Sequence, residues 1–435
     1  GEEAFESLIT VLSNGTDYQK IHAAEALGDI KDHRALPHLI ANLKDDNPRV
    51  KAKAASAIGE YDHPPLEPLL DALNDEDTYV RYTLAEGLQK IGKPAVRPLI
   101  ERLDAGEVNT RCGAALALGM IRDKRAVGPL TNAIEQDTSF ARYEVVKALG
   151  KIGDTIAVPF LLNTLDKAYF DPGCNDLFLA QYTMQALGRI GDPRAVKLLM
   201  EVFKNEDFPD QSNSVTALIR IGAPAAGPLI SLFSDTTDEI TAGFISNILI
   251  IMGLESVPYL IEALDNEKSG VRSGAAWTLG RITDKRAIPH LLNALKDPES
   301  VVRARAAEAL GNFRDTATVQ ALIEALADES PLVREKAVQS LGFTGDPRAT
   351  QPLFKLLEDT NPSKRSQVIT ALGRIRDRRA VDPLLQVMKE DNKLKKEALD
   401  ALVYITRKYP GDSYKEWQKW WNENRDSLPM EEDEW

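Results

Sequence analysis

The side chains able to bind a metal ion or attack a substrate are few in this chain and far apart. The five histidines, none of which precedes a Glu, are His22, His33, His38, His63 and His290. Metal sites on helices commonly use two His four residues apart, and no such pair occurs here. The sequence also contains no Gly-rich phosphate loop, no G-x-S-x-G motif and no Cys–His arrangement. We therefore expect no catalytic residue, no bound metal and no cofactor, and a protein that is not an enzyme.

Residues suited to noncovalent binding do follow a regular spacing through the middle of the chain. Aromatic, amide and small residues recur about every thirty positions, whereas the corresponding positions nearer the two ends are mostly charged or small. Large rings beside small residues are typical of a recessed surface that binds a partner. The predicted partner-binding residues are Tyr82, Leu116, Tyr143, Gln181, Gln185, Asn247 and Trp277 of this row, together with Tyr182 and Phe244, which lie one position off it. The alternative is that the rings fill gaps between slightly irregular repeats.

A basic row has the same spacing. Its members are Lys90, Lys151, Arg189, Arg220, Arg281 and Arg374. We add Arg189, Arg220 and Arg281 to the partner-binding set, because an arginine beside aromatic rings is suited to receive a carboxylate. Cations near the C-terminus of a helix also complement the helix dipole, and this alternative requires no ligand.

Both rows follow a sequence repeat that occurs thirteen times. It is clearest as VRARAAEALGNFRD at Val302–Asp315 and recurs as VKAKAASAIGEYD at Val50–Asp62. Eleven of the twelve intervals between corresponding residues are thirty or thirty-one positions long, and the remaining one is thirty-eight. A period of this length indicates a solenoid, in which each unit buries its apolar face against its neighbours.

Each unit is predicted to form two antiparallel helices. The first has apolar residues three and four positions apart and a proline near its start, as in RAIPHLLNAL at Arg286–Leu295. The second carries V-R-x-x-A-A-x-A-L-G, whose paired alanines let neighbouring helices approach closely, and whose Gly we interpret as helix punctuation. Six junctions contain Asp-x-Arg, in which we expect the Asp to cap a helix and the Arg to bond back to it. These Asp residues are Asp32, Asp123, Asp192, Asp284, Asp346 and Asp377.

This pattern resembles HEAT repeats, specifically the short bacterial type named after the phycobiliprotein lyases, from about Ala4 to Tyr404. The resemblance implies an all-α, right-handed α-solenoid of about thirteen armadillo-like helix pairs over residues 1–405, with the second helices on the concave side. Residues 406–426 are Trp-rich and are predicted to form a capping helix, since a solenoid must cover its last exposed seam. Residues 427–435 are predicted to be an acidic, mobile tail.

The longest interval contains an insertion, residues 166–176 (DKAYFDPGCND), in the sixth repeat. Insertions in repeat proteins usually form loops on one edge, often on a binding face. We therefore expect a loop there in which Tyr169, Phe170 and Cys174 could contact a partner. The alternative is a surface loop without a binding role.

Composition limits the partners and the compartment. The net charge of −13 argues against nucleic acid, whose binding requires clustered Lys and Arg. No apolar stretch approaches the eighteen residues of a membrane span. Two cysteines cannot form a disulfide framework, so a reducing compartment is expected. We predict a cytoplasmic protein, or a periplasmic one if a leader was removed before Gly1.

These observations favour a nonenzymatic protein–protein interaction scaffold or assembly factor that binds a partner protein in its concave groove. Two enzyme families with related repeats fit poorly: deoxyhypusine hydroxylases bind iron through His-Glu pairs, and HEAT-like DNA glycosylases use a basic concave surface. The resemblance to lyase repeats leaves one alternative, a phycobilin lyase or tetrapyrrole chaperone acting on antenna proteins. The aromatic row would then hold the pigment, and the arginines its propionates.

Overall fold

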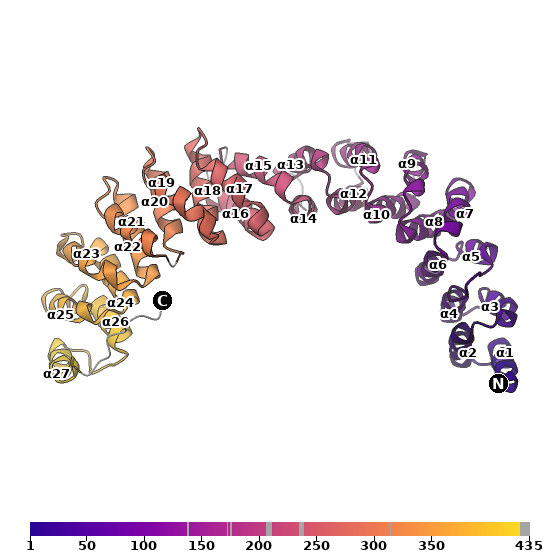
Figure 1. Ribbon diagram of the computed structural model, residues 1–435, viewed down its shortest axis with the longest axis horizontal. Helices are drawn as coiled ribbons and strands as arrows, with labels where there is room; N and C mark the ends of the chain where they lie inside the picture. Colours follow the sequence, from indigo (N-terminus) through magenta and orange to yellow (C-terminus); the bar gives the residue numbers. More distant parts are fainter. Residues whose placement is uncertain are drawn as a thin grey trace. The chain divides into compact units, whose positions relative to one another are not determined.

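The computed structural model describes residues 1–136, 139–171, 173–174, 176–205, 211–234, 239–313 and 315–426. Their regular structure is entirely helical, which confirms the predicted all-α fold. The helices divide into two compact units, Gly1–Ile221 and Gly222–Trp435. In each unit the helices form two layers, one of first helices and one of second helices (Figure 1). The predicted acidic tail lies outside the described residues.

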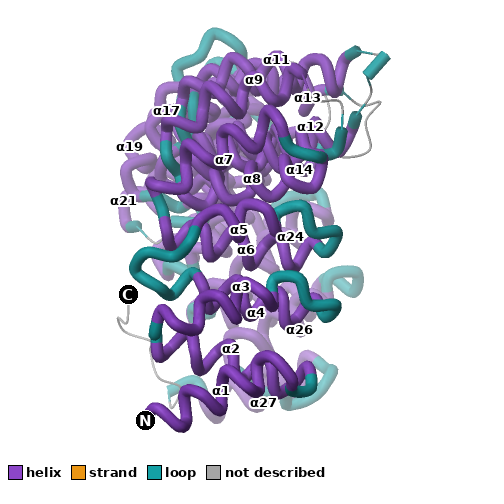
Figure 2. Tube along the Cα trace, turned by 90° about the vertical axis from the view of Figure 1, so that its right-hand side faces the viewer, coloured by secondary structure: helices purple, strands orange, loops and turns teal. Residues whose placement is uncertain are grey.

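Unit 1 contains seven helix pairs within the described residues. Its first helices are α1 (Glu2–Asn14), α3 (Leu36–Asn42), α5 (Leu66–Ala72), α7 (Lys93–Ala105), α9 (Val127–Gln136), α11 (Val158–Phe170) and α13 (Val196–Lys204). Its second helices are α2 (Asp17–Ile30), α4 (Pro48–Ile58), α6 (Thr78–Ile91), α8 (Val108–Ile121), α10 (Ala141–Ile152), α12 (Leu177–Ile190) and α14 (Ser212–Ile221). These helices are stacked one above another, and the loops join their ends (Figure 2).

Unit 2 contributes six further pairs and one additional helix in its described part. Its first helices are α15 (Ala223–Ser231), α17 (Val257–Ala263), α19 (Ile288–Ala294), α21 (Thr316–Ala325), α23 (Thr350–Phe354) and α25 (Val381–Glu390). Its second helices are α16 (Glu239–Met252), α18 (Ser269–Ile282), α20 (Ser300–Leu310), α22 (Pro331–Thr344), α24 (Pro362–Ile375) and α26 (Lys395–Thr406), and α27 (Tyr414–Asn424) follows them. The thirteen pairs match the predicted repeat.

Ten short 3-10 helices, named η1 to η10, lie between these elements in the described residues. They are η1 (His33–Ala35), η2 (Lys124–Ala126), η3 (Thr155–Ala157), η4 (Pro193–Ala195), η5 (Leu232–Ser234), η6 (Gly253–Glu255), η7 (Lys285–Ala287), η8 (Pro347–Ala349), η9 (Lys355–Glu358) and η10 (Arg378–Ala380). Most of them lead into a first helix. They therefore fix the direction in which each first helix begins.

The apolar core follows the repeat. The residue before the final Gly of the A-L-G pattern has no exposed surface in any of the thirteen units, from Leu27 and Ile58 to Leu372 and Leu402. Burying a side chain of this size contributes about 2 kcal/mol. The second helices therefore pack through one continuous line of Leu and Ile, which explains why this position is almost invariant along the chain.

The glycines of A-L-G have a different role from the predicted one. Gly28, Gly119 and Gly280 lie inside their helices, not after them. A Cβ on Gly119 would lie 2.8 Å from Cα of Ala148, and one on Gly280 would lie 2.5 Å from Cα of Ala309. No side chain fits at such distances, so these glycines permit backbone contact between successive second helices. The interpretation as helix punctuation was wrong for these glycines, whereas Gly59 and Gly311 do end their helices.

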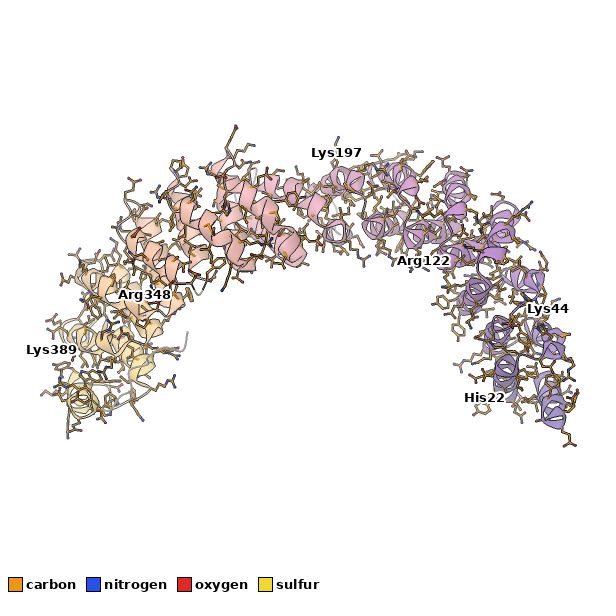
Figure 3. The ribbon with its side chains drawn as sticks, viewed as in Figure 1. His22, Lys44, Arg122, Lys197, Arg348 and Lys389 are labelled. Atoms are coloured by element: carbon orange, nitrogen blue, oxygen red, sulfur yellow. The ribbon has the colours of Figure 1, made fainter. Side chains whose placement is uncertain are left out.

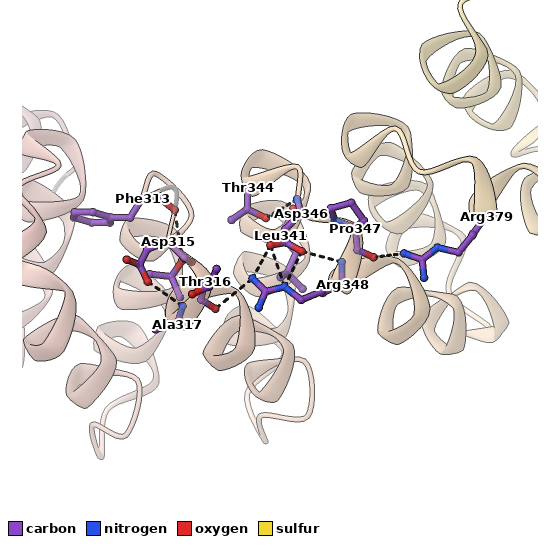
Figure 4. Close-up of polar contacts among 11 residues, drawn as sticks. Phe313, Asp315, Thr316, Ala317, Leu341, Thr344, Asp346, Pro347, Arg348 and Arg379 are labelled. Atoms are coloured by element: carbon purple, nitrogen blue, oxygen red, sulfur yellow. Dashed lines mark hydrogen bonds and ion pairs between the residues drawn. The ribbon is translucent and has the colours of Figure 1, made fainter. Parts of the chain in front are cut away.

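The Asp-x-Arg junctions confirm the predicted cap. In η8, Asp346 Oδ1 accepts a hydrogen bond of 2.8 Å from the backbone N–H of Arg348, and the Arg348 guanidinium pairs with the same carboxylate at 2.6 Å. The guanidinium also donates to the carbonyl of Thr316 in the preceding repeat, at 3.4 Å (Figure 4). Arg379 donates in the same way to the carbonyl of Pro347, at 2.7 Å. The motif therefore caps one repeat and bonds to the previous one.

In two repeats of unit 2 the arginine of the V-R pattern links its repeat to the next, whereas Arg81 and Arg334 bond within their own repeats. Arg272 donates to the backbone carbonyls of Asn266 and Glu267 within its own repeat, at 2.8 and 3.0 Å. It also forms a bidentate pair with Asp297 of the next repeat, at 2.6 and 2.9 Å. Arg303 and Asp328 repeat this arrangement. Because both charges are largely buried and fully bonded, this row of cations stabilises the stack and is not available to a ligand.

Two prolines do not lie where the repeat predicts them. Pro98 and Pro228 are inside α7 and α15, whereas Pro37 and Pro289 lie in the first turn of their helices. Both exceptions follow junctions without Asp-x-Arg, where the helix begins several residues earlier, at Lys93 and Ala223. The proline is therefore displaced into the second turn.

Helix α27 of the C-terminal segment packs on α25 of the last helix pair. Trp417 and Trp421 of α27 are buried, and the Trp421 indole donates to Asp382 of α25 at 2.8 Å. Ser413 and Glu416 form a reciprocal capping box at the start of the helix. Helix α27 therefore has a defined start and a buried apolar face packed on the last pair.

Candidate partner-binding faces

The predicted partner-binding residues all lie on second helices. In unit 1 they occupy α6, α8, α10, α12 and α14, and in unit 2 they occupy α16 and α18. The second helices line the inner side of the curve of unit 1, where His22 of α2 points, while Lys197 of α13 points outward (Figure 3). We call the exposed side of the second helices the second-helix face and treat it separately for each unit.

The aromatic residues of this face differ in exposure. Tyr82 on α6 and Phe244 on α16 are 44% and 45% exposed, whereas Tyr143, Tyr182 and Trp277 are partly buried. The first two therefore leave somewhat less than half of their surface exposed. The other three contribute to packing between repeats as well as to the surface, as the alternative interpretation of the row describes.

Tyr143 and Tyr182 connect α10 with α12. Their ring centroids lie 5.8 Å apart, and Nζ of Lys147 lies 4.0 Å above the ring of Tyr182. The Tyr143 hydroxyl donates to Asp176 at 3.1 Å. Asp176 in turn caps α12 by accepting from the N–H of Leu179 at 3.0 Å. Burial, followed by the hydrogen bond to Asp176, raises the pKa of Tyr143, so this phenol remains neutral at physiological pH.

The amide residues and Leu116 complete the second-helix face of unit 1. Gln181, Gln185 and Leu116 are partly buried, and the Gln185 amide donates to the side chain of Asn213 on α14 at 3.2 Å. Arg189 and Arg220 are exposed on α12 and α14. Neither arginine forms an ion pair with a described residue, whereas Lys90 pairs with Glu60. The basic row is therefore partly neutralised and partly open.

In unit 2 the rings are stacked with arginines. Trp277 lies between Arg281 and Arg305, whose guanidinium carbons are 5.5 and 5.2 Å from its ring. Such contacts stabilise by about 0.5–1 kcal/mol at an exposed surface. Asn247 is exposed one turn from Phe244 on α16. Arg281 is thus oriented by an aromatic face and not by an acid.

Sequence reasoning missed Phe343 on α22, which is 62% exposed and lies under Arg374 at 4.4 Å. Phe343 directly follows the Gly of its repeat, at the position where the basic row has its cations. Its register was therefore visible in the sequence. Phe343 is uncharged and therefore does not belong to the basic row as its lysines and arginines define it.

The insertion forms less of a loop than predicted. Residues 166–170 continue α11, and Tyr169 is buried with its hydroxyl 3.5 Å from the carbonyl of Val202. Tyr169 is therefore a core residue and is not accessible to a partner, which corrects its assignment to a loop. Phe170 is 39% exposed and packs edge-on against Tyr169, and Cys174 is exposed. The spacing of Leu161, Leu165 and Tyr169, four residues apart, is the helical signal that could have shown this.

Within the described residues, no group of three or more His, Cys, Asp or Glu side chains is arranged to hold a metal ion. Within the same ranges, no helix has both the length and the apolar character needed to cross a membrane. The fold and its surface thus define a helical repeat protein with two second-helix faces.

Comparison with known families identifies the repeat. The profile of HEAT repeats matches residues 36–106, 96–171, 253–310, 288–363 and 350–410, which is more than half of the chain. The PBS lyase HEAT-like repeat matches residues 20–45 and 180–205. The chain belongs to the HEAT-repeat family. A search of curated protein sequences finds no match.

Several solved structures align with this chain at low sequence identity. The crystal structure of Kap121p is 14% identical, with a TM-score of 0.48 over 98% of this chain and 54% of Kap121p. The crystal structure of Kap121p bound to Nup53p is 15% identical in sequence and has a TM-score of 0.48, over 98% of this chain and 55% of Kap121p. Human deoxyhypusine hydroxylase in complex with glycerol is 20% identical in sequence and has a TM-score of 0.26, over 65% of this chain and 96% of the hydroxylase. The chain spans about half the length of Kap121p, and these similarities identify neither a function nor a partner.

Proposed function

We propose that this protein is a nonenzymatic scaffold that binds a segment of a partner protein on its second-helix faces. The observation that carries the proposal is the exposure of Tyr82 and Phe244, large rings on second helices. They are separate from the apolar line of the repeat, which the same helices fill with a fully buried Leu. Spaced aromatic side chains on a surface of this kind are typical of binding anchors.

The polar groups nearby suit a peptide chain. Asn247 is exposed one turn from Phe244, and its amide offers both a donor and an acceptor to a peptide backbone. Gln185 is partly exposed and is already oriented by Asn213. Arg281 is held against Trp277 and has donors to spare. These groups would fix the direction of a bound segment, while the rings supply most of the contact area.

Site-specific photocrosslinking tests this proposal directly. A benzoyl-phenylalanine residue replaces Tyr82 or Phe244 in the full chain, and matched controls replace Phe160 of α11 and Tyr259 of α17. The controls lie on first helices and are 37% and 38% exposed, close to the test positions. After irradiation in native lysate, we expect the same adduct from Tyr82 or Phe244 and not from the controls. Equal labelling from all four positions would refute the proposal.

A further inference from the structure

A group of four cations in unit 1 includes three that form no ion pair with a described residue. We call Arg122, Lys147, Lys151 and Arg189 the Lys151 cluster; they lie at the end of α8, on α10 and on α12. Lys151 is partly buried, and its aliphatic stem crosses α8 at Gly119, where a Cβ would lie 3.4 Å from its Cδ. The other three cations are close enough to affect its ionisation. Second helices of three successive repeats therefore bring their positive charges together.

The charges facing Lys151 sum to an excess of cations. Burial is the largest influence and lowers the pKa of Lys151; Arg189, Lys147 and Arg122 lower it further, while Glu144 raises it. Glu144 is the one carboxylate among these influences, and it already pairs with Lys147 at 2.8 Å. Arg122, Lys151 and Arg189 form no ion pair with any residue that the structure describes. Four cations and one acid leave a local charge of +3.

Elsewhere in the stack, several cations are paired with acids of the next repeat. Lys51 pairs with Asp75 at 2.7 Å, Arg272 with Asp297 at 2.6 Å, and Arg303 with Asp328 at 2.9 Å. The whole chain carries a charge of −13, so acids are abundant and would have been available here. Like charges held together repel one another; the C-terminal ends of α10 and α12 offset part of this repulsion, and bound carboxylates would offset more of it.

A hollow next to the cluster is also lined mostly by basic side chains. It has a volume of about 690 Å³ and is lined by Lys93, Arg122, Asp123, Lys124, Arg125 and Pro94. Arg125 pairs with Asp123 at 2.7 Å and Lys124 with Asp154 at 3.2 Å, whereas Lys93 and Arg122 form no ion pair with a described residue. Arg122 belongs to both the hollow and the cluster. A bound chain could therefore place successive acids along one basic path.

We propose that the Lys151 cluster binds the carboxylates of an acidic segment in the partner protein. This inference rests on the proposed scaffold function and states the chemistry of the bound segment in unit 1. The rings of Tyr143 and Tyr182 border the cluster through Lys147 and offer apolar contact beside the cations. A peptide with acids between apolar residues fits this surface. A nucleic acid fits it less well, because the basic surface is short and the surrounding protein is acidic.

The test uses a fluorescein-labelled peptide of alternating Glu and Leu and the full-length protein. The variant Lys151→Gln with Arg189→Gln removes two charges, and we expect the Kd of the peptide to rise at least about tenfold. The matched control, Lys44→Gln with Lys197→Gln, removes two exposed cations of unit 1 outside the cluster and is expected to change Kd less than about twofold. Equal losses in both variants would show nonspecific attraction and overturn the proposal. Tighter binding of labelled oligothymidylate at the same ionic strength would also overturn it.

A second measurement locates the peptide. Isotope-labelled lysine allows the titration of Lys151 to be followed by NMR, with Lys151→Gln as the assignment control. A bound carboxylate favours the charged amine, so we expect the peptide to raise the pKa of Lys151 toward its ordinary value. An unchanged titration in the presence of bound peptide would place the peptide elsewhere and refute the assignment. If the double variant still forms the crosslink from Tyr82, the scaffold proposal stands, but the proposal that the Lys151 cluster selects an acidic segment is refuted.

Discussion

Gly280 shows how one missing methyl group sets the distance between neighbouring second helices. Its Cα faces Ala309 of the next repeat so closely that any side chain would meet the opposite backbone. Backbone cannot move aside as the end of a flexible side chain can. The contact explains why the repeat places Gly after Leu, and why Ala stands two positions before the next such Gly.

Replacing Gly280 by Ala should therefore destabilise the protein. The new Cβ would lie 2.5 Å from both Cα and Cβ of Ala309, and overpacking of this kind costs about 1–3 kcal/mol. The control is Gly227→Ala in α15, where no atom lies within 4 Å of the new Cβ. That change should stabilise by about 0.5–1 kcal/mol, because Ala is the better helix former. Urea unfolding measures the free energy of unfolding, which should fall for Gly280→Ala and rise for Gly227→Ala. A rise for both variants would contradict the close contact at Gly280.

The end of α18 carries strain at a single residue. Thr283 has φ 57°, a left-handed conformation that is unfavourable for a β-branched side chain. We expect Thr283→Gly to raise the free energy of unfolding by about 1 kcal/mol. Gly191 ends α12 with φ 73° and open space around it, so Gly191→Ala should lower stability through the backbone alone. Thermal melts of both variants test the pair, and a lower Tm for Thr283→Gly would show that its side chain matters more than its backbone.

At the scale of elements, the Asp-x-Arg junctions make the helix starts sensitive to acid. The hydrogen bond from the Arg125 guanidinium, followed by the one from its N–H, lowers the pKa of Asp123 to about 2. Arg34 lowers the pKa of Asp32 to about 2 in the same way. A carboxylate with a lowered folded pKa contributes its full stability above the unfolded value of about 3.9, and loses it as the pH falls through the folded value.

The variant Asp32→Asn, Asp123→Asn and Asp192→Asn should therefore show a flatter loss of stability between about pH 4 and pH 2 than the unmodified chain. The Asn side chain keeps the oxygen that accepts the capping hydrogen bond, but it carries no carboxylate that can be protonated as the pH falls. Denaturant unfolding across this range measures the slope. Asp166→Asn, an exposed residue outside the motif, is the control and should leave the slope unchanged. A triple variant with the unmodified slope would mean that other carboxylates govern acid unfolding.

The elements also show which parts of the structure could be predicted from the sequence. Asp346 and Arg348 are two residues apart, so their contact is local and the motif alone predicted it. Gly119 meets Ala148 across two helices. The repeat shows that Gly and Ala recur at these two positions, but it does not show that the two residues are in contact. For the insertion, Pro172 and Gly173 favour a turn, whereas the four-residue spacing up to Tyr169 favours a helix, and α11 does continue to Phe170.

The candidate site was predicted in register but not in detail. The repeat placed Tyr82, Tyr143 and Trp277 on second helices, as the structure confirms. It could not distinguish an exposed ring from one held between repeats, because burial depends on side chains about thirty residues away. The excess charge around Lys151 depends likewise on which acids are close in space. Charge balance can be judged only when the neighbouring helices are in place.

At the scale of the whole molecule, each repeat is stabilised by its sequence neighbours, and a terminal repeat lacks one of them. Helix α27 replaces the missing neighbour, because Trp417 is fully buried and Trp421 is anchored to Asp382 of α25. In a stack with nearest-neighbour coupling, loss of such a cap raises local opening most at the end and progressively less inward.

We therefore expect Trp417→Ala to act locally in unit 2. Truncation of a buried Trp costs about 3–5 kcal/mol, which would release α27 from α25 and speed hydrogen exchange in α25, α26 and α27. The acceleration should be smaller in α24 and smaller again in α22, because each interface transmits only part of the loss. Trp420→Phe, at a partly exposed ring of the same helix, is the control. Hydrogen exchange followed by mass spectrometry resolves this gradient. Uniform acceleration throughout unit 2 would instead mean that its repeats unfold as one cooperative block and that α27 stabilises all of them equally.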